Sequence, residues 1–248
     1  MPGTAGLGYI STRRLRGTRL PATITPVECL PHGYTNDTRR VGNRIEKRYE
    51  GADAVARAER EFTSLTHLLG HCPVPEVVRF DPSVPMVILT EVIGRHGQEL
   101  IDEGRGSSVL RLVGNQLARL QVLDPSMVPG LNGEGDVIVH GDFGPQNILC
   151  DVDLAHVSGI LDWELAHVGS PIEDLAWAEW IVRMHHPEAL DDLPDLFTTS
   201  GLSFSWSDRQ AAMVRQCHSY IAYCEASEMK ATAVQWKRRL HNTEQWRE

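Results

Sequence analysis

The sequence predicts an α+β protein with a β-rich first lobe and a mainly helical second lobe. Strand-like runs separated by turn residues fill much of residues 31–94, and apolar residues at helical spacing dominate from residue 107 onward. Between them, two short apolar runs flank a polar His-Gly-Asp stretch. The chain of 248 residues is long enough for two lobes with a cleft between them. We expect a first lobe over residues 28–93, a linker near 91–96 and a second lobe over 94–248.

The first lobe should contain strands and a helix. Residues 31–49 are typical of two strands around turns, because glycine, asparagine and aspartate supply turn conformations there. Residues 51–70 form a predicted helix with Ala58, Phe62, Leu65 and Leu69 on one apolar stripe. Residues 85–94 are predicted to be a buried strand that runs into a short connector.

The second lobe is expected to be mainly helical. Residues 107–123 carry leucine and valine at helical spacing. Residues 171–184 form a predicted helix with an acid in the first turn, where a carboxylate meets the positive end of the helix dipole. Residues 136–142 and 156–164 look like short strands that flank a loop. Two more helices are predicted over 208–225 and 228–248.

Composition and charge narrow the class of protein. Hydrophobic residues make up 42% of the chain and charged residues 23%, which is ordinary for a soluble globular enzyme. The net charge of −9 argues against a nucleic-acid partner, and no apolar stretch approaches the ~20 residues of a membrane span. Five scattered cysteines without a Cys-x-x-Cys pair indicate a reducing, cytoplasmic compartment and no metal cage.

Residues 1–27 form a basic segment with four arginines and no acid before Glu28. They contain no apolar core of the signal-peptide type. We interpret them as a loosely ordered arm, and the alternative is an edge strand of the first lobe.

The stretch from Val137 to Cys150 has a pattern that suits phosphoryl transfer. That reaction needs a group that orients the acceptor hydroxyl, metal ions on the phosphates and a cation on the phosphate oxygens. Asp142 and Asn147 have the five-residue spacing of the kinase catalytic loop, so the loop can aim Asp142 at the acceptor and Asn147 at a magnesium ion. Asp162 ends a short apolar strand fifteen residues later and is the predicted second ligand, since oxygen ligands suit magnesium.

The same loop spells Asp-Phe-Gly at residues 142–144, the letters of the kinase magnesium motif. Its position after His140 and before Asn147 makes it part of the catalytic loop instead. The magnesium aspartate is therefore predicted to be Asp162.

Three motifs, in this order, resemble the aminoglycoside phosphotransferase family, which shares its fold with protein kinases and choline kinases. They are His140-Gly141-Asp142-x-x-x-x-Asn147, Ile160-Leu161-Asp162-Trp163-Glu164 and Gly169-Ser170-Pro171-x-x-Asp174-Leu175-Ala176. The resemblance covers about residues 30–180 and implies a bilobal, protein-kinase-like fold. The chain departs from the family at position 170, which is serine where the family often has aspartate.

The resemblance also implies nucleotide-binding residues in the first lobe. Residues 33–38 resemble the family's phosphate-covering hairpin, with Thr35 and Asn36 near the nucleotide. Lys47 resembles the strand lysine that holds the α- and β-phosphates. Glu61 resembles the helical partner of that lysine, and Glu59 is the rival.

The adenine-binding hinge is expected at residues 89–94. This segment resembles the connector through which the family grips the base with backbone groups. Glu91 and Ile93 are the expected contact positions.

Several residues near the motifs have a structural interpretation beside the functional one. His140 is expected to shape the loop rather than carry a proton, and Asp174 to cap a helix and anchor the loop. Glu164 either touches a metal-bound water or makes a structural hydrogen bond, and both remain open. Trp177 and Trp180 lie three residues apart on one helix face, which is what core packing requires, and an aromatic face near the acceptor site that suits a cation is the alternative.

An acidic run at residues 185–197 is expected to be a solvated face. The alternative is an acidic rim that binds an aminated substrate. A metal site at His185 and His186 is disfavoured, because no third ligand has suitable spacing.

Together these features predict a small-molecule O-phosphotransferase that uses ATP or GTP with Mg²⁺. The first choice of acceptor is a hydroxyl of an aminoglycoside-like or other cationic metabolite. Choline, homoserine, macrolides and sugars are alternatives within the family's chemistry. A nucleotide-binding pseudokinase without turnover is the alternative from another class. A protein kinase is disfavoured, because the loop reads His-Gly-Asp and no Ala-Pro-Glu segment follows Asp162.

Overall fold

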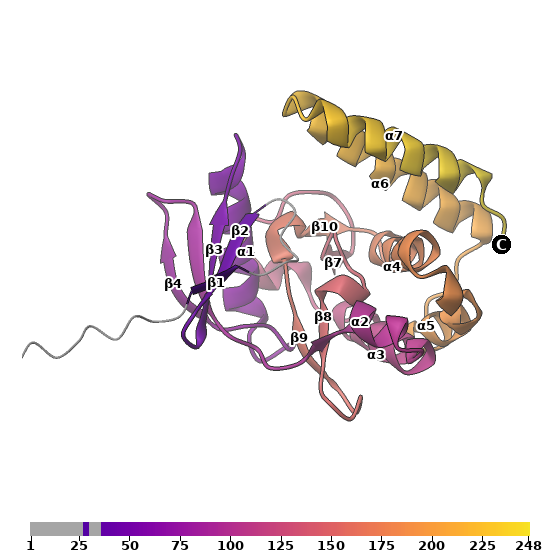
Figure 1. The fold of residues 1–248 in the computed structure, drawn as a ribbon, viewed down its shortest axis with the longest axis horizontal. Helices are drawn as coiled ribbons and strands as arrows, with labels where there is room; N and C mark the ends of the chain where they lie inside the picture. The colour runs from indigo at the N-terminus through magenta and orange to yellow at the C-terminus, as the bar shows by residue number, and fades with distance from the viewer. Residues whose placement is uncertain (1–26, 30–35) are drawn as a thin grey trace, which may run out of the picture.

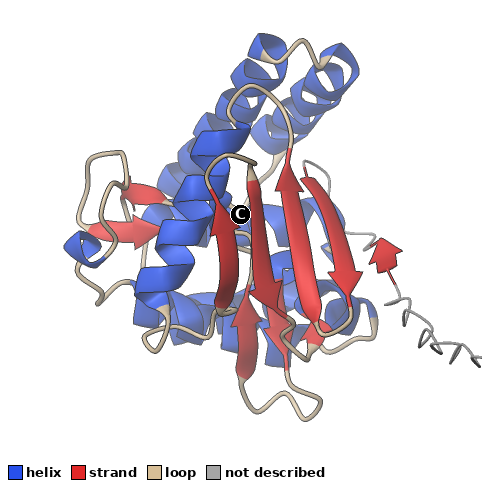
Figure 2. Ribbon diagram, turned by 90° about the vertical axis from the view of Figure 1, so that its left-hand side faces the viewer, coloured by secondary structure: helices blue, strands red, loops and turns tan. Residues whose placement is uncertain are grey.

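The computed structural model describes residues 27–29 and 36–248, and in them a β-sheet lobe joins a mainly helical lobe (Figures 1 and 2). The first lobe is built on a five-stranded antiparallel sheet with the order β1-β2-β3-β5-β4. Its strands are β1 (Val27–Cys29), β2 (Asn36–Val41), β3 (Arg44–Tyr49), β4 (Val77–Asp81) and β5 (Met86–Thr90).

The centre of this sheet places Lys47 on its buried face. In the register of β3 and β5, Lys47 lies opposite Val87 and Ile45 lies opposite Leu89. Side chains alternate between the two faces of a strand, so these four share one face. Helix α1 (Ala54–Leu68) packs against β3, β4 and β5, and its apolar stripe joins the same core cluster as Val87 and Leu89.

The second lobe consists of six helices among the described residues, with short strands between them (Figure 1). The helices are α2 (Gly97–Asp102), α3 (Gly106–Leu120), α4 (Ile172–His185), α5 (Leu193–Ser200), α6 (Trp206–Ala226) and α7 (Lys230–Gln245). Strands β6 (Arg95–His96), β8 (Ile148–Cys150) and β9 (Val157–Ile160) form one small sheet, and β7 (Val137–Val139) pairs with β10 (His167–Gly169). Single turns of 3₁₀ helix are η1 (Pro125–Met127), η2 (Pro145–Asn147) and η3 (Trp163–Leu165), and η4 (Pro187–Asp192) is longer.

The buried apolar residues form two clusters. The larger cluster runs from α1 and the sheet into α3, β7 and β9. The smaller cluster is rich in aromatic residues and lies among α4, α6 and α7. The segment that carries Asp142 lies in the chain between β7 of one small sheet and β8 of the other.

The α+β fold class and its bilobal, kinase-like layout are confirmed. Helices occur at all five segments predicted to be helical. Helices α1 and α3 bury an apolar face, whereas α4 is buried on nearly all sides between Ile172 and Val182. Helices α2 and α5 and strands β6, β8 and β10 were not predicted, since each has at most eight residues and shows little periodicity. The lobe boundary at residues 93 and 94 stays a prediction. The predicted basic arm lies, apart from Val27, outside the described residues, and β1 occupies an edge of the sheet.

Candidate active site

Lys47 forms a buried ion pair with α1. Its ammonium donates to Glu61 Oε2 at 2.5 Å, and the side chains of both residues are at most 4% exposed. Glu61 lies on the buried stripe of α1, whereas Glu59 is exposed, so the helix presents Glu61 to the lysine. Tyr49 Oη also donates to Glu61 Oε2, at 2.5 Å.

The same ammonium reaches across to the second lobe and donates to Asp162 Oδ1. Burial alone would lower the pKa of Lys47, but the carboxylates of Asp162 and Glu61 outweigh it and hold the pKa well above its ordinary value. Burial acts against ionisation of Asp162, and the ammonium of Lys47 overcomes this effect and lowers the pKa of that carboxyl. The lysine is therefore a cation and Asp162 is a carboxylate at neutral pH.

Asp142 follows β7 in a loop whose backbone requires glycine before it. Gly141 has a φ of 84°, and a Cβ there would lie 2.6 Å from the carbonyl oxygen of Leu165. Asn147 Nδ2 donates to Asp142 Oδ2 at 2.9 Å, and Trp177 Nε1 donates to Asp142 Oδ1 at 2.8 Å. These two hydrogen bonds lower the pKa of Asp142, but burial has the larger effect and raises the pKa to about 7. A carboxylate with such a pKa can accept a proton near neutral pH.

Asp174 and His140 hold the Asp142 loop in place through hydrogen bonds to its backbone. The backbone N–H groups of His140 and Gly141 donate to the two carboxylate oxygens of Asp174 at 2.7 and 3.0 Å. His140 Nε2 lies 2.8 Å from the carbonyl oxygen of Leu161, and the Asp142 N–H donates to His140 Nδ1 at 3.2 Å. Burial lowers the pKa of His140 to about 4, so the ring is neutral and acts through hydrogen bonds.

Glu164 is a junction between the two lobes. In η3, its Oε2 accepts from Asn36 Nδ2 at 2.7 Å and from Arg57 Nη1 at 3.2 Å. Lys47 Nζ lies 3.5 Å from the same oxygen. These contacts favour the structural interpretation of Glu164 over contact with a metal-bound water.

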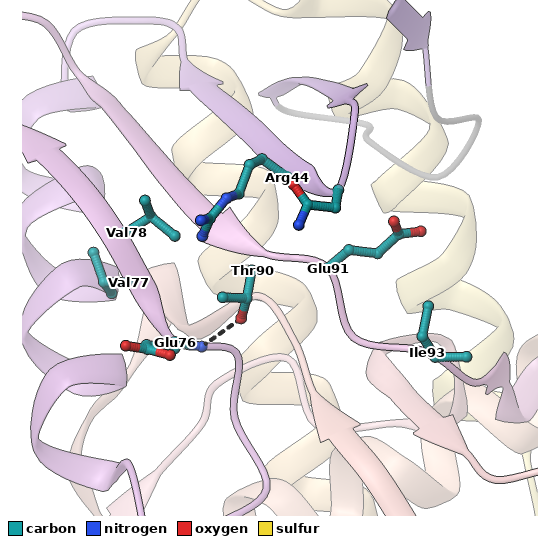
Figure 3. Close-up of a pocket in the computed structure, with 8 residues that line it drawn as sticks. Arg44, Glu76, Val77, Val78, Thr90, Glu91 and Ile93 are labelled. Carbon is teal, nitrogen blue, oxygen red and sulfur yellow. Dashed lines mark hydrogen bonds between the residues drawn. The ribbon is translucent and has the colours of Figure 1, made fainter. Parts of the chain in front are cut away.

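The remaining residues predicted to bind the nucleotide differ in their surroundings. Asn36 lies in β2 and contacts Glu164, whereas Thr35 lies outside the described residues. Glu91 and Ile93 line a hollow of about 610 Å³ beside the end of β5, together with Arg44 and Thr90 (Figure 3). None of Lys47, Asp142, Asn147 and Asp162 lines this hollow.

Two residues beside Asp142 and Glu164 were not predicted from the sequence to belong to the site. Arg57 is 3% exposed and contacts Asn36, Asp53 and Glu164, and its position four residues before Glu61 marks a polar pair on a buried stripe. Trp177 was predicted to pack in the core, with an aromatic face near the acceptor site as the alternative, and its bond to Asp142 was not predicted. Trp177 lies three residues after Asp174 on the same helix face, and this spacing could have indicated that it lies near the loop that Asp174 holds.

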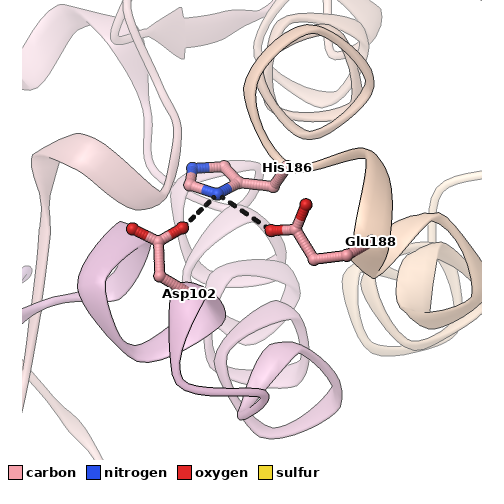
Figure 4. A group of neighbouring side chains, drawn as sticks. All are labelled: Asp102, His186 and Glu188. Carbon is pink, nitrogen blue, oxygen red and sulfur yellow. Dashed lines mark hydrogen bonds and ion pairs between the residues drawn. The ribbon is translucent and has the colours of Figure 1, made fainter.

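A second polar group lies around His186, away from Asp142. Its Nδ1 faces Asp102 Oδ1 at 3.0 Å and Glu188 Oε1 at 3.5 Å (Figure 4). A cation at Nδ1 would move the ring proton to Nε2, which is buried and has no hydrogen-bond partner among the described residues. Donation from Nδ1–H to Asp102 avoids that cost and ties α2 to η4, so we assign the group to structure.

Comparison with known proteins gives the family context. The sequence model of the phosphotransferase enzyme family matches residues 123–197, which include Asp142, Asn147 and Asp162. The GDP complex of aminoglycoside 2'-phosphotransferase-IIIa has a similar structure, with a TM-score of 0.70 at 13% identity, over 90% of this chain and 93% of that one.

Two further solved structures agree. A choline/ethanolamine kinase family protein from Mesorhizobium loti has a TM-score of 0.64 at 14% identity, over 92% of each chain. A variant of aminoglycoside phosphotransferase APH(4)-Ia in complex with ADP and hygromycin B has a TM-score of 0.63 at 15% identity, over 88% of this chain and 92% of that one. The chain has the fold of the aminoglycoside phosphotransferases. The resemblance of its motifs to that family is confirmed.

Two curated proteins match shorter segments of this chain. Acyl-CoA dehydrogenase family member 11 of Gallus gallus is 44% identical over 43 residues, which is 17% of this chain and 6% of that protein. Probable acyl-CoA dehydrogenase IBR3 of Arabidopsis thaliana is 29% identical over 102 residues, which is 40% of this chain and 11% of that protein. The chain thus matches only a small part of the length of these relatives. Within residues 27–29 and 36–248, no helix combines the length and apolar character needed to cross a membrane.

Proposed function

We propose that the protein is a small-molecule O-phosphotransferase that moves the γ-phosphoryl group of ATP or GTP to a hydroxyl group. One observation carries the proposal. Lys47 of the first lobe bonds both Glu61 and Asp162, although Asp162 lies 115 residues further along the chain. A phosphate-binding cation, its helical partner and a carboxylate suited to a metal are the parts that phosphoryl transfer requires in one place.

Asn147 and Asp162 fit a magnesium ion by the chemistry of their donors. Both offer oxygen ligands, which Mg²⁺ prefers, and Asp162 is ionised. Asn147 donates through Nδ2 to the backbone oxygen and the carboxylate of Asp142, so its Oδ1 remains the atom suited to a cation. When bound, Mg²⁺ would neutralise charge on the phosphate oxygens.

Asp142 is the proposed general base. Its carboxylate is fixed by two hydrogen bonds and has a pKa near neutrality, so it can orient an acceptor hydroxyl and take its proton during transfer. Lys47 would hold the nucleotide phosphates, and Glu61 would hold Lys47. His140 and Asp174 would keep the loop in place, and Asn36, Glu91 and Ile93 would lie beside the nucleotide.

The acceptor we propose first is an aminoglycoside-like or other hydroxylated cationic metabolite. The support comes from neighbours whose structures hold kanamycin or hygromycin B. GDP, ADP and AMP-PNP in those structures support a nucleotide as the donor.

A second acceptor class follows from the curated relatives. Both are named as acyl-CoA dehydrogenases, and their matching segments are parts of much longer chains. A hydroxylated acyl-CoA is therefore a further candidate acceptor. It is anionic, so it differs from an aminoglycoside in the charge that the acceptor site must accept.

The test is nucleotide diphosphate release from ATP or GTP in the presence of Mg²⁺, with Asp142→Ala as the blank. The acceptor panel holds aminoglycosides, macrolides, choline, homoserine, simple sugars and a hydroxyacyl-CoA. We expect release above the blank with one class. Nucleotide binding without release on any acceptor would contradict the proposal and favour a pseudokinase.

A second variant tests the metal site. Asp162→Ala should weaken nucleotide binding in the presence of Mg²⁺ and leave binding without Mg²⁺ nearly unchanged, as measured by titration calorimetry. An unaltered magnesium requirement would show that Asp162 does not hold the metal.

A further inference from the structure

Trp177 contacts the proposed catalytic base directly. It lies on α4 and is 3% exposed, and its indole N–H donates to Asp142 Oδ1 at 2.8 Å. The other carboxylate oxygen accepts from Asn147 at 2.9 Å. Gln146 Nε2 lies 3.4 Å from Oδ1, near the limit of a hydrogen bond. The indole is thus the closest donor to one of the two oxygens.

We propose that Trp177 is a positioning residue that fixes the plane of the Asp142 carboxylate through its indole N–H. With one oxygen held by the indole and the other by Asn147, the carboxylate cannot rotate about its Cβ–Cγ bond without breaking a short bond. The remaining lone pairs then keep one direction toward the acceptor hydroxyl. The inference rests on the proposed function, and it adds a residue that the motif pattern does not contain.

The indole itself is held in place by an aromatic stack. Its ring is parallel to that of Trp180, with centroids 4.4 Å apart, and it also stacks on Tyr220 at 5.4 Å. Tyr220 in turn stacks on Trp236 of α7 at 4.4 Å. A ring clamped on its faces cannot swing its N–H away, so packing among α4, α6 and α7 determines the direction of the bond to Asp142.

An indole suits this position because it donates without carrying charge. A cation at the same place would stabilise the carboxylate more strongly and make it a weaker base. The neutral N–H fixes the geometry of the carboxylate without placing a positive charge beside it.

Trp180 offers a matched control. It lies one turn further along α4, is 1% exposed and takes part in the same stack. Its indole N–H donates to Thr243 Oγ1 at 2.8 Å, far from Asp142 in the chain. Trp177→Phe and Trp180→Phe therefore each remove one buried indole N–H and retain a ring, and the first alone removes a donor to Asp142.

The first measurement is steady-state kinetics of both variants with the acceptor that the nucleotide-release test identifies. We expect Trp177→Phe to lower kcat about 10- to 100-fold, in the range of other supporting hydrogen bonds, with little change in the KM for nucleotide. Trp180→Phe should keep kcat within about twofold of the unaltered protein. An equal loss of kcat in both variants would reduce Trp177 to a packing role and overturn the inference.

The second measurement does not depend on the acceptor. The indole ¹H–¹⁵N signal of Trp177 is assigned by its loss in Trp177→Phe, and that of Trp180 by its loss in Trp180→Phe. Asp142→Asn should shift the Trp177 signal clearly and leave that of Trp180 nearly in place. A Trp177 signal that does not respond would overturn the inference while the proposed function stands. Lack of transfer by the unaltered protein would instead overturn the proposed function, and with it the positioning role.

Discussion

The ion pair of Lys47 and Glu61 shows what a single residue contributes at this site. Burying two charges is costly, and their attraction offsets this cost only while both are present. Lys47→Met would leave Glu61 buried with Tyr49 as its remaining close partner. We expect a loss of about 3 kcal/mol in the free energy of unfolding, measured by urea denaturation. The double variant Lys47→Met with Glu61→Gln should recover much of that loss, because no buried charge is left unpaired.

A surface lysine provides the control for this prediction. Lys237 is more than half exposed and pairs with Glu225 at 2.6 Å. Lys237→Met should change the free energy of unfolding by less than about 0.5 kcal/mol. If Lys47→Met changed stability no more than Lys237→Met, the ion pair would not be essential to the fold.

The buried ring of His140 should make the free energy of unfolding depend on pH. Its pKa falls from the ordinary 6.5 to about 4 in the folded protein because the ring is fully buried. Between about pH 6.5 and 4, the His140 ring is therefore protonated in the unfolded chain and neutral in the folded chain. The stabilisation is complete above pH 6.5, and up to about 3 kcal/mol is lost as the pH falls from 6.5 toward 4.

The measurement is the free energy of unfolding between pH 7.5 and 4.5 for the unaltered protein and for His140→Gln. We expect the variant to be less stable at pH 7.5 but to lose less stability on acidification. Equal losses in the two proteins would show that His140 does not control this part of the profile.

Among the elements, helices α3 and α5 make an unusually close contact at Gly114. A Cβ there would lie 2.6 Å from the carbonyl oxygen of Leu196 and 2.1 Å from Thr199 Oγ1. Helix propensity alone favours alanine over glycine by about 1 kcal/mol. The cost of the clash should exceed this gain in helix propensity, because the facing carbonyl of Leu196 cannot move without shifting α5. Gly114→Ala should therefore lower the free energy of unfolding by about 2 kcal/mol or more.

A substitution at the neighbouring position 115 measures the effect of helix propensity without the backbone clash. Asn115 lies next to Gly114 on α3 and is exposed. Asn115→Ala should be neutral or stabilise the protein by a few tenths of a kcal/mol, measured by thermal unfolding. A Gly114→Ala variant as stable as Asn115→Ala would show that the two helices can move apart at little cost.

The elements also show how far the sequence could predict the structure. The long helices were predictable because a stripe such as Ala58, Phe62 and Leu65 repeats at helical spacing. The last predicted member of that stripe, Leu69, is 49% exposed, and Leu68 is buried instead, because α1 ends at Leu68. The Asp142 loop was recognisable because its function fixes the spacing to Asn147. Strands of three residues have no period to detect. The bonds from Trp177 to Asp142 and from Arg57 to Glu164 join residues 35 and 107 positions apart, so only the packed fold brings them together.

At the scale of the whole molecule, Arg57 and Glu164 tie the two lobes together beside the site. Helix α1 contacts η3, and Arg57 Nη1 binds both Asn36 Oδ1 at 3.0 Å and Glu164 Oε2 at 3.2 Å. One guanidinium thus joins the hairpin, the helix that carries Glu61 and the segment after Asp162. Movement of any one of these three would break a bond to the others, so the network couples the phosphate-binding parts of both lobes.

Arg57→Met tests this coupling, because it keeps the apolar stem of the side chain and removes the bonds to the other lobe. We expect faster amide hydrogen exchange in α1 and η3, while exchange in α3 stays as slow as in the unaltered protein. Arg60→Met is the control, since Arg60 donates at 2.7 Å to the backbone carbonyl of Glu164 and not to its carboxylate. If both variants raised exchange in η3 equally, any link between α1 and η3 would suffice. A larger effect of Arg57→Met would assign the coupling to the carboxylate of Glu164, which connects movement of the hairpin to the position of Asp162.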